Sequence, residues 1–121
     1  RSAEGYLALA TDKWRAKKYD AALQDVYTGL VLNPEDIRIK ATLITRKGAI
    51  FGDLGLYSKA EAFYKEAMIV DPAFSWPHNN LGGLYQNQEK LEEAEIEYKE
   101  TIKLDPQFLM PHYNLGFLYR K

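Results

Sequence analysis

A constant step between matching residues is the feature of this 121-residue chain that most constrains its fold. Residues 76–85 read WPHNNLGGLY, and residues 110–119 read MPHYNLGFLY. The same step leads from Gly48 to Gly82 and from Tyr64 to Tyr98. A period of about 34 residues is typical of proteins in which one small structural unit stacks on the next. We therefore expect an array of repeats.

The N-terminal part follows the same pattern with two adjustments. The step from Ala22 to Ala60 is longer by four positions than the step from Ala60 to Ala94, and we place the additional residues in the stretch before Gly48. Four residues make about one helical turn, roughly 6 Å, so we expect an extended first turn on the helix that begins near Asp36. One residue is also expected to be missing near Lys17. That gap aligns Leu7, Ala10, Thr11 and Trp14 with His78, Leu81, Gly82 and Tyr85.

Each repeat contains two helical patterns, with apolar or small residues at i, i+3, i+4 and i+7. The second repeat shows them at Ile44, Gly48 and Phe51, with Lys47 at the remaining position, and again at Ala60, Phe63, Tyr64 and Ala67. Asn-Pro or Asp-Pro pairs end the second helices at residues 33–34, 71–72 and 105–106, because proline disfavours helical backbone in the residue before it. No run shows the alternation of a strand, so the fold is predicted to be all-α.

With these residues the chain resembles the tetratricopeptide-repeat proteins. The family pattern has Leu-Gly and Tyr in the first helix, Ala and an aromatic residue in the second, and a closing Pro. The third repeat has Leu81, Gly82, Tyr85, Ala94, Tyr98 and Pro106 at these positions. The resemblance implies a right-handed α-solenoid of antiparallel helix pairs, a superhelix with seven helices here. It treats residues 1–121 as a single array, with repeats at about 3–36, 37–74 and 75–108 and a half repeat at 109–121.

Small residues recur where the paired helices are expected to meet. Glycine at 48, 82 and 116 has no side chain, so a partner helix can approach closely there. Alanine at 22, 60 and 94 should do the same from the second helix of each pair. Tyr85 and Tyr98 are then expected to fill the space between neighbouring helices.

Composition excludes several classes of function. Sixteen basic and seventeen acidic residues give a net charge of −1, which lacks the basic excess of a nonspecific nucleic-acid or membrane-surface binder. With no cysteine, disulfides, thiolate nucleophiles and cysteine-based metal sites are excluded. The sequence has no phosphate-binding glycine loop, metalloprotease motif or serine elbow. We expect a protein that is not an enzyme, has no cofactor, binds no nucleic acid and does not insert into membranes.

The stripe beside the packing face of each first helix is the candidate peptide-binding site. This stripe should line a concave groove, and it is rich in amide and aromatic groups. Asparagine can both donate and accept, which suits the backbone of an extended peptide. Asn80 and Asn114 resemble the asparagine ladders on which some tetratricopeptide superhelices hold peptides; alternatively, these asparagines are solvated or bond the neighbouring helix. The predicted groove residues are Thr45, Arg46, Trp76, Asn79, Asn80, Asn87, Tyr113, Asn114 and Phe117.

Arg46 takes the equivalent position in the second repeat. It could pair with a carboxylate of a ligand or with Asp12 or Asp53 of this chain. Chaperone-binding members of the family clamp a C-terminal carboxylate with Lys, Asn, Asn, Lys and Arg. This chain has Arg46 where that clamp has its middle Asn, and Trp76 and Asn80 where it has the last Lys and Arg. The clamp does not carry over, so we do not expect binding of chaperone C-termini.

His78 and His112 lie one repeat apart and could suggest a metal site. Both occupy positions that the family fills with a packing aromatic residue. Two histidines without a nearby carboxylate or thiolate make a poor metal site. We therefore expect both histidines to pack between helices, with no metal bound.

The main functional hypothesis is an adaptor that binds a peptide segment of another protein in the groove. The alternatives are a self-assembly or scaffold segment of a larger protein, and a regulatory module attached to an enzyme elsewhere in the chain. The sequence begins with arginine, and no second helix covers the core-type face of Leu115, Leu118 and Tyr119. We therefore expect a fragment of a longer protein that could self-associate through its C-terminal helix. The sequence does not fix the compartment, and the cytoplasm is taken as the default.

Overall fold

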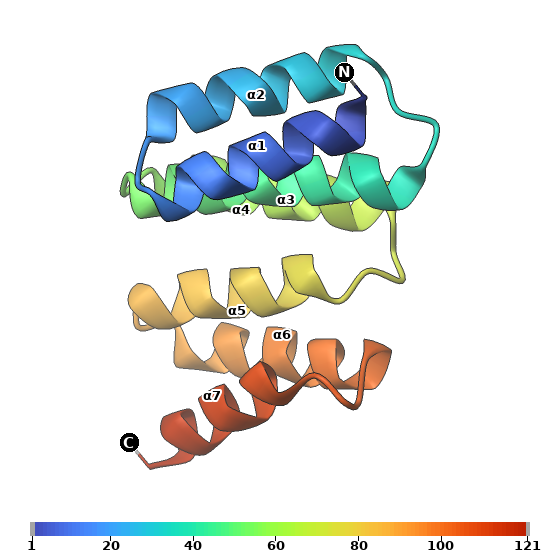
Figure 1. Cartoon of the computed structure of the whole chain (residues 1–121). Helices are drawn as coiled ribbons and strands as arrows, with labels where there is room; N and C mark the ends of the chain where they lie inside the picture. The colour runs from blue at the N-terminus through green and yellow to red at the C-terminus, as the bar shows by residue number, and fades with distance from the viewer. Residues whose placement is uncertain (1, 121) are drawn as a thin grey trace. The chain divides into compact units, whose positions relative to one another are not determined.

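The computed structural model describes residues 2–120, and these residues form seven α-helices joined by short turns (Figure 1). The helices are α1 (Ala3–Arg15), α2 (Tyr19–Val31), α3 (Ile37–Asp53), α4 (Tyr57–Val70), α5 (Trp76–Asn87), α6 (Leu91–Leu104) and α7 (Leu109–Tyr119). No strand occurs among the described residues. The all-α class, the seven helices and their antiparallel pairing are confirmed.

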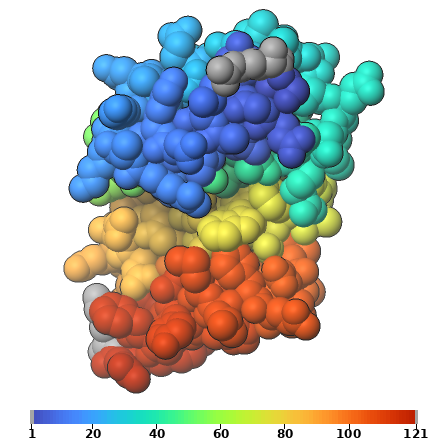
Figure 2. Space-filling model, viewed as in Figure 1, coloured from blue at the N-terminus to red at the C-terminus, as the bar shows by residue number. Residues whose placement is uncertain are grey.

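The described residues form two compact units that divide between Pro72 and Ala73. In the N-terminal unit, α1 pairs with α2 and α3 pairs with α4, while α3 also packs against α1 and α2. The space-filling view shows the dark-blue side chains of α1 covering much of α3 on the face turned to the viewer (Figure 2). In the C-terminal unit, α5 pairs with α6, and α7 packs on α6.

Glycine determines how closely the two helices of a pair approach each other. A β-carbon at Gly48 would lie 2.7 Å from Cε1 of Tyr64, and one at Gly82 would lie 2.6 Å from Cε1 of Tyr98. Atoms in van der Waals contact stay about 3.5 Å or more apart, so neither position accepts a side chain without displacing the ring. The expected close approach is confirmed at both pairs, and the alanines at 22, 60 and 94 are fully buried.

The three helix-pair turns share one backbone arrangement. Lys17, Gly55 and Glu89 each lie two residues beyond the end of the first helix and have φ values of 60°, 79° and 58°. The next amide donates to the carbonyl five residues earlier, from Lys18 to the Lys13 carbonyl at 2.8 Å and from Lys90 to the Tyr85 carbonyl at 2.9 Å. This is the bonding of a Schellman C-cap with its left-handed residue.

The shared turn shows that the expected one-residue gap near Lys17 is wrong. Counting back from the turns, Ala10 corresponds to Gly82, Lys13 to Tyr85 and Trp14 to Gln86. Ala10 is fully buried in a core cluster with Ala22, Val26 and Ile50, as the glycine position requires. Lys13 turns toward α2 instead, where its Nζ lies 2.6 Å from Asp25. Trp14 therefore corresponds to the residue after the tyrosine position, but it still packs against the Ala10 cluster as expected. Thr11 is not a glycine replacement.

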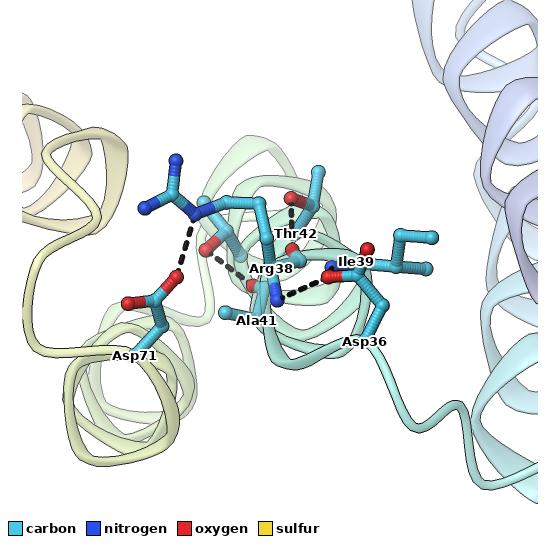
Figure 3. Close-up of polar contacts among 7 residues, drawn as sticks. Asp36, Arg38, Ile39, Ala41, Thr42 and Asp71 are labelled. Atoms are coloured by element: carbon cyan, nitrogen blue, oxygen red, sulfur yellow. Dashed lines mark hydrogen bonds and ion pairs between the residues drawn. The ribbon is translucent and has the colours of Figure 1, made fainter.

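The four additional residues lengthen α3 at its start, as expected. This helix has 17 residues against 12 in α5. The Asp36 carboxylate caps it by accepting from the amides of Arg38 at 2.8 Å and Ile39 at 3.2 Å. Figure 3 shows the added turn pointing Arg38 at the buried Asp71 carboxylate, with 2.5 Å between Nε and Oδ2. The insertion thus ties the start of α3 to the residue that follows α4.

Candidate functional site

Arg46 lies at the centre of a small cluster between α1 and α3. Its guanidinium carbon is 4.5 Å from the centroid of the Trp14 ring, a cation–π contact. Its Nε donates to the Thr11 hydroxyl at 3.2 Å, and that hydroxyl donates to the Leu7 carbonyl at 2.9 Å. We call Thr11, Trp14, Arg46 and Asp53 the Arg46 site. Two contacts from α1 therefore hold the guanidinium in place before any ligand arrives.

Asp53 positions the indole and leaves the arginine without an anion. Its carboxylate accepts from Nε1 of Trp14 at 2.9 Å. Burial and then the neighbouring Asp53 carboxylate raise the pKa of Tyr19, which lies at the start of α2. Within residues 2–120, Arg46 forms no ion pair with Asp12, Asp53 or any other acidic group. Neither of the two internal partners considered for Arg46 is used.

The charge of Arg46 is poorly compensated. Burial lowers the pKa of its guanidinium, and the positive charge of Arg15 lowers the pKa further, while Tyr64 acts in the opposite direction. Arginine nevertheless stays protonated in proteins. The Arg46 site is thus a partly desolvated cation with free N–H donors, and an incoming carboxylate would relieve both the lost hydration and the repulsion from Arg15.

In the C-terminal unit, amide and aromatic side chains lie along α5 and α7. The Trp76 ring packs on Phe108 with 4.6 Å between ring centroids and an interplanar angle of 51°. Asn80 and Asn114 are half-buried, and their side-chain amides form no hydrogen bond with the described residues. Tyr113 is 82% exposed. Asn87 and Phe117 are exposed as well.

Two of the predicted groove residues point into the fold. Thr45 is buried, and its hydroxyl donates to the Ala41 carbonyl of its own helix at 2.7 Å. Asn79 is buried too, and its Oδ1 has no hydrogen-bond partner among the described residues. Neither side chain is exposed enough to line an open groove. The remaining predicted residues, Arg46, Trp76, Asn80, Asn87, Tyr113, Asn114 and Phe117, are at least partly accessible.

Sequence reasoning missed Thr11 and Trp14, which complete the Arg46 site. The misplaced gap aligned Trp14 with Tyr85. The expected packing of Trp14 against the core is confirmed, but its contact with Arg46 was not predicted. The equal distances from Lys17 to Ala22 and from Gly55 to Ala60 were the signal that would have placed both residues correctly.

The histidines differ from expectation in two respects. His78 packs between α5 and α6 as expected, but a carboxylate is close by, since its Nδ1 lies 2.8 Å from Oε1 of Glu97. His112 is exposed, with its Nε2 3.3 Å from the Pro106 carbonyl. Within the described part of the chain, no group of three or more potential metal ligands comes together.

The face expected to be bare on α7 is partly covered. Leu115 and Leu118 are both only 8% exposed because they pack where α7 meets α6. Tyr119 is exposed, and its hydroxyl donates to Oε1 of Glu95 at 2.8 Å. The two leucines therefore do not form an open apolar surface. No helix within residues 2–120 is both long and apolar enough to cross a bilayer.

Antiparallel helix pairs that recur at a constant step, closed by glycine against tyrosine, define a helical-repeat protein. The sequence profile described as tetratricopeptide repeat matches residues 41–74 and 77–108, more than half of the chain. The chain belongs to the tetratricopeptide-repeat family, whose repeats are modules for protein–protein interaction. A search of curated proteins finds no match.

Solved structures share this fold at low sequence identity. The first TPR of Spaghetti (RPAP3), bound to the HSP90 peptide SRMEEVD, is 19% identical with a TM-score of 0.82, covering 98% of this chain and 91% of that one. The Arabidopsis OM64 TPR domain is 18% identical with a TM-score of 0.84, covering 98% and 95%. YrrB, described as a TPR protein with an unusual peptide-binding site, is 17% identical with a TM-score of 0.76, covering 96% and 58%.

Proposed function

We propose that this chain is a non-catalytic adaptor that binds a peptide segment of another protein along its first helices. Each unit offers its own contact surface: the Arg46 site of α1 and α3 in the N-terminal unit, and the amide-aromatic side chains of α5 and α7 in the C-terminal unit. The observation that carries the proposal is Arg46, a partly buried cation that two contacts hold in place and no anion neutralises. Such an arrangement suits an acidic residue of a ligand.

The Arg46 site selects the charge of the ligand. The guanidinium has five N–H donors, and Thr11 takes one of them. The remaining donors can form two parallel hydrogen bonds with a carboxylate. The Trp14 ring supports the plane of the guanidinium from one side. An Asp or Glu side chain, or a C-terminal carboxylate, is the ligand group that this geometry fits.

The C-terminal unit contributes contacts that do not depend on the ligand sequence. Asn80 and Asn114 stand one repeat apart and have uncommitted amides. Each can donate to a peptide carbonyl and accept from a peptide amide. Tyr113 offers a large exposed ring for apolar side chains of the ligand. The peptide-bound Spaghetti structure and the peptide-binding site named for YrrB support this general mode of action.

Two matched decapeptide libraries, identical except for a central Glu or Gln, test the charge preference. We expect the Glu library to bind more tightly, and Arg46→Gln to lower that affinity about 10-fold, because a charge-assisted hydrogen bond contributes about 1.5–3 kcal/mol. Lys103→Gln, an exposed cation on the second helix α6, is the matched control and should bind like the wild type. An Arg46→Gln variant that binds the Glu library as tightly as the wild type, or that still prefers the Glu library over the Gln library, would overturn the role of Arg46.

The asparagines are tested in the same assay. Replacing both Asn80 and Asn114 with alanine should weaken binding of the Glu library while the far-ultraviolet circular dichroism spectrum stays unchanged. An unaltered affinity in that double variant would show that the amides do not hold the peptide backbone.

A further inference from the structure

A second arginine lies beside the Arg46 site. Arg15 is the last residue of α1, and it is exposed. It stands four residues after Thr11, and residues at i and i+4 are neighbours on one face of a helix. Because the Thr11 hydroxyl accepts from Nε of Arg46 at 3.2 Å, the side chain of Arg15 starts one helical turn from the group that holds the Arg46 guanidinium. Two arginines from two helices therefore border the same surface.

This chain neutralises neither arginine. Among residues 2–120, no acidic side chain forms an ion pair with Arg15 or Arg46, although Asp12 precedes Arg15 by only three positions. The Asp53 carboxylate accepts from the Trp14 indole instead. The positive charge of Arg15 is close enough to lower the pKa of Arg46. The surface between the two guanidiniums is therefore positively charged and open to an anion.

The turn after α1 adds to this positive charge. Lys17 and Lys18 are both exposed, and neither forms an ion pair within the described part of the chain. Charges of this kind attract an anion at longer range and are weakened by salt. Close recognition depends on the guanidiniums, because only Arg46 is already held in place by neighbouring side chains.

The charge and shape of the anion decide which ligand group fits both arginines. A carboxylate carries one negative charge, and in a bidentate pair it turns both oxygens toward a single guanidinium. A phosphoryl group on a side chain has three acceptor oxygens and a charge of about −1.5 to −2 near pH 7. It can therefore accept from two guanidiniums at once and balance two positive charges.

We propose that Arg15 and Arg46 together bind a phosphorylated serine or threonine of the ligand protein. The inference rests on the proposed function, because Arg46 is shared, and it names the chemical class of residue that the site prefers. Two phosphoryl oxygens would accept from Arg46, and the third would accept from Arg15. Thr11 and Trp14 already hold the Arg46 guanidinium, so only the Arg15 side chain has to become ordered on binding.

A third decapeptide library, with phosphoserine at the central position, tests this preference beside the Glu and Gln libraries. We expect it to bind about 10-fold more tightly than the Glu library, because it gains a further charge-assisted hydrogen bond. Arg15→Gln should remove most of this preference, whereas the control Lys103→Gln should keep it. A phosphoserine library that binds no more tightly than the Glu library, or a preference that persists in Arg15→Gln, would overturn the proposal.

The pH dependence separates a phosphoryl group from a carboxylate. The second pKa of phosphoserine is about 6, so this group loses charge between about pH 7.5 and about pH 5, while glutamate stays largely ionised. The advantage of the phosphoserine library should shrink over this interval. His78 and His112 titrate in the same range but lie in the C-terminal unit, so the ratio of the two affinities reports on the ligand. A constant ratio would overturn recognition of the doubly charged group.

Two further outcomes separate this inference from the proposed function. If the Glu library binds through Arg46 and the phosphoserine library gains nothing, the inference fails and the proposed function stands. If neither library binds, both fail. Inorganic phosphate, at the concentration of phosphoserine library that half-saturates the protein, should displace little of the library, because the peptide makes further contacts. Displacement as effective as that by the library itself would show that the site takes a free anion, and would overturn a protein ligand as its source.

Discussion

The ring of Tyr98 covers Gly82 so closely that a β-carbon at residue 82 would lie within 2.6 Å of ring carbon Cε1. The same relation joins Tyr64 to Gly48 in the N-terminal unit. The pairs α3 with α4 and α5 with α6 therefore each depend on one position at which any side chain is too large. The Tyr98 hydroxyl is satisfied at the same time, because it donates to Oε1 of Gln86 at 2.7 Å.

Gly82→Ala should destabilise the chain even though alanine is the better helix former. Overpacking against the Tyr98 ring costs about 1–3 kcal/mol, and the gain in helix propensity returns up to about 1 kcal/mol. Urea unfolding followed by circular dichroism measures the net change. At Gly83, the next residue, a β-carbon would lie 3.8 Å from the Tyr98 hydroxyl. Gly83→Ala should therefore raise the unfolding free energy by up to about 1 kcal/mol. Stabilisation by both substitutions would contradict the close packing.

Alkaline stability should depend on Tyr98. Burial raises the pKa of its phenol to about 12, from an ordinary value of 10.0. Because the folded-state value lies above the unfolded one, the stabilisation is complete below pH 10 and is lost as the pH rises through 12. The wild type should lose unfolding free energy across this window, and Tyr98→Phe should lose less. Urea titrations at pH 9, 10, 11 and 12 on both proteins measure the difference, and parallel curves would contradict it.

Arg38→Ala should lower the unfolding free energy by about 1–2 kcal/mol. It leaves the Asp71 carboxylate, only 5% exposed, without its arginine. A fully buried pair would cost more, but half of the Arg38 side chain is exposed to solvent. Lys65→Ala breaks the exposed pair with Glu61 and serves as the control, with an expected loss of about 0.3–0.5 kcal/mol. Thermal unfolding in low salt compares the stability of the two variants. Equal losses would show that the pair with Asp71 contributes no more than the exposed pair.

Ligand binding at the Arg46 site should change the fluorescence of Trp14. The guanidinium lies 4.5 Å from the ring centroid, so neutralising its charge alters the field at the indole. Trp76→Phe leaves Trp14 as the one tryptophan of the chain, and a Glu-containing decapeptide should shift its emission. In Trp14→Phe the remaining emission comes from Trp76, and the peptide should cause no emission shift that depends on Arg46. Unchanged Trp14 emission at a saturating peptide concentration would mean that the ligand binds elsewhere.

The sequence predicted those parts of the fold that are repeated. Gly48 and Gly82 recur at a fixed step from Tyr64 and Tyr98, and only close helix packing explains glycine at such positions. The extended start of α3 also followed from counting, because four residues make about one helical turn. Both features depend on spacing along the chain, and spacing is visible without a structure.

The Arg46 site could not be predicted because it depends on contacts between residues far apart in sequence. Arg46 meets Thr11 across 35 residues, and Trp14 meets Asp53 across 39. The register of α1 decides which residues face α3, and an error of one residue aligns Trp14 with Tyr85 instead of Gln86. His78 and Glu97 are likewise brought together only when α6 folds back on α5. Side-chain partners of this kind follow from the packing of helix pairs and not from either helix alone.

The common turn at Lys17, Gly55 and Glu89 has a consequence for engineering. Because a left-handed residue and the same pair of amide hydrogen bonds close each hairpin, a crossover at Gly55 or Glu89 joins helices with compatible ends. Chimeras that join α3 to α6 or α5 to α4 should therefore keep their register, because both combinations also keep a glycine opposite a tyrosine. Glycine at positions 17 and 89 would relieve the left-handed strain in such hybrids.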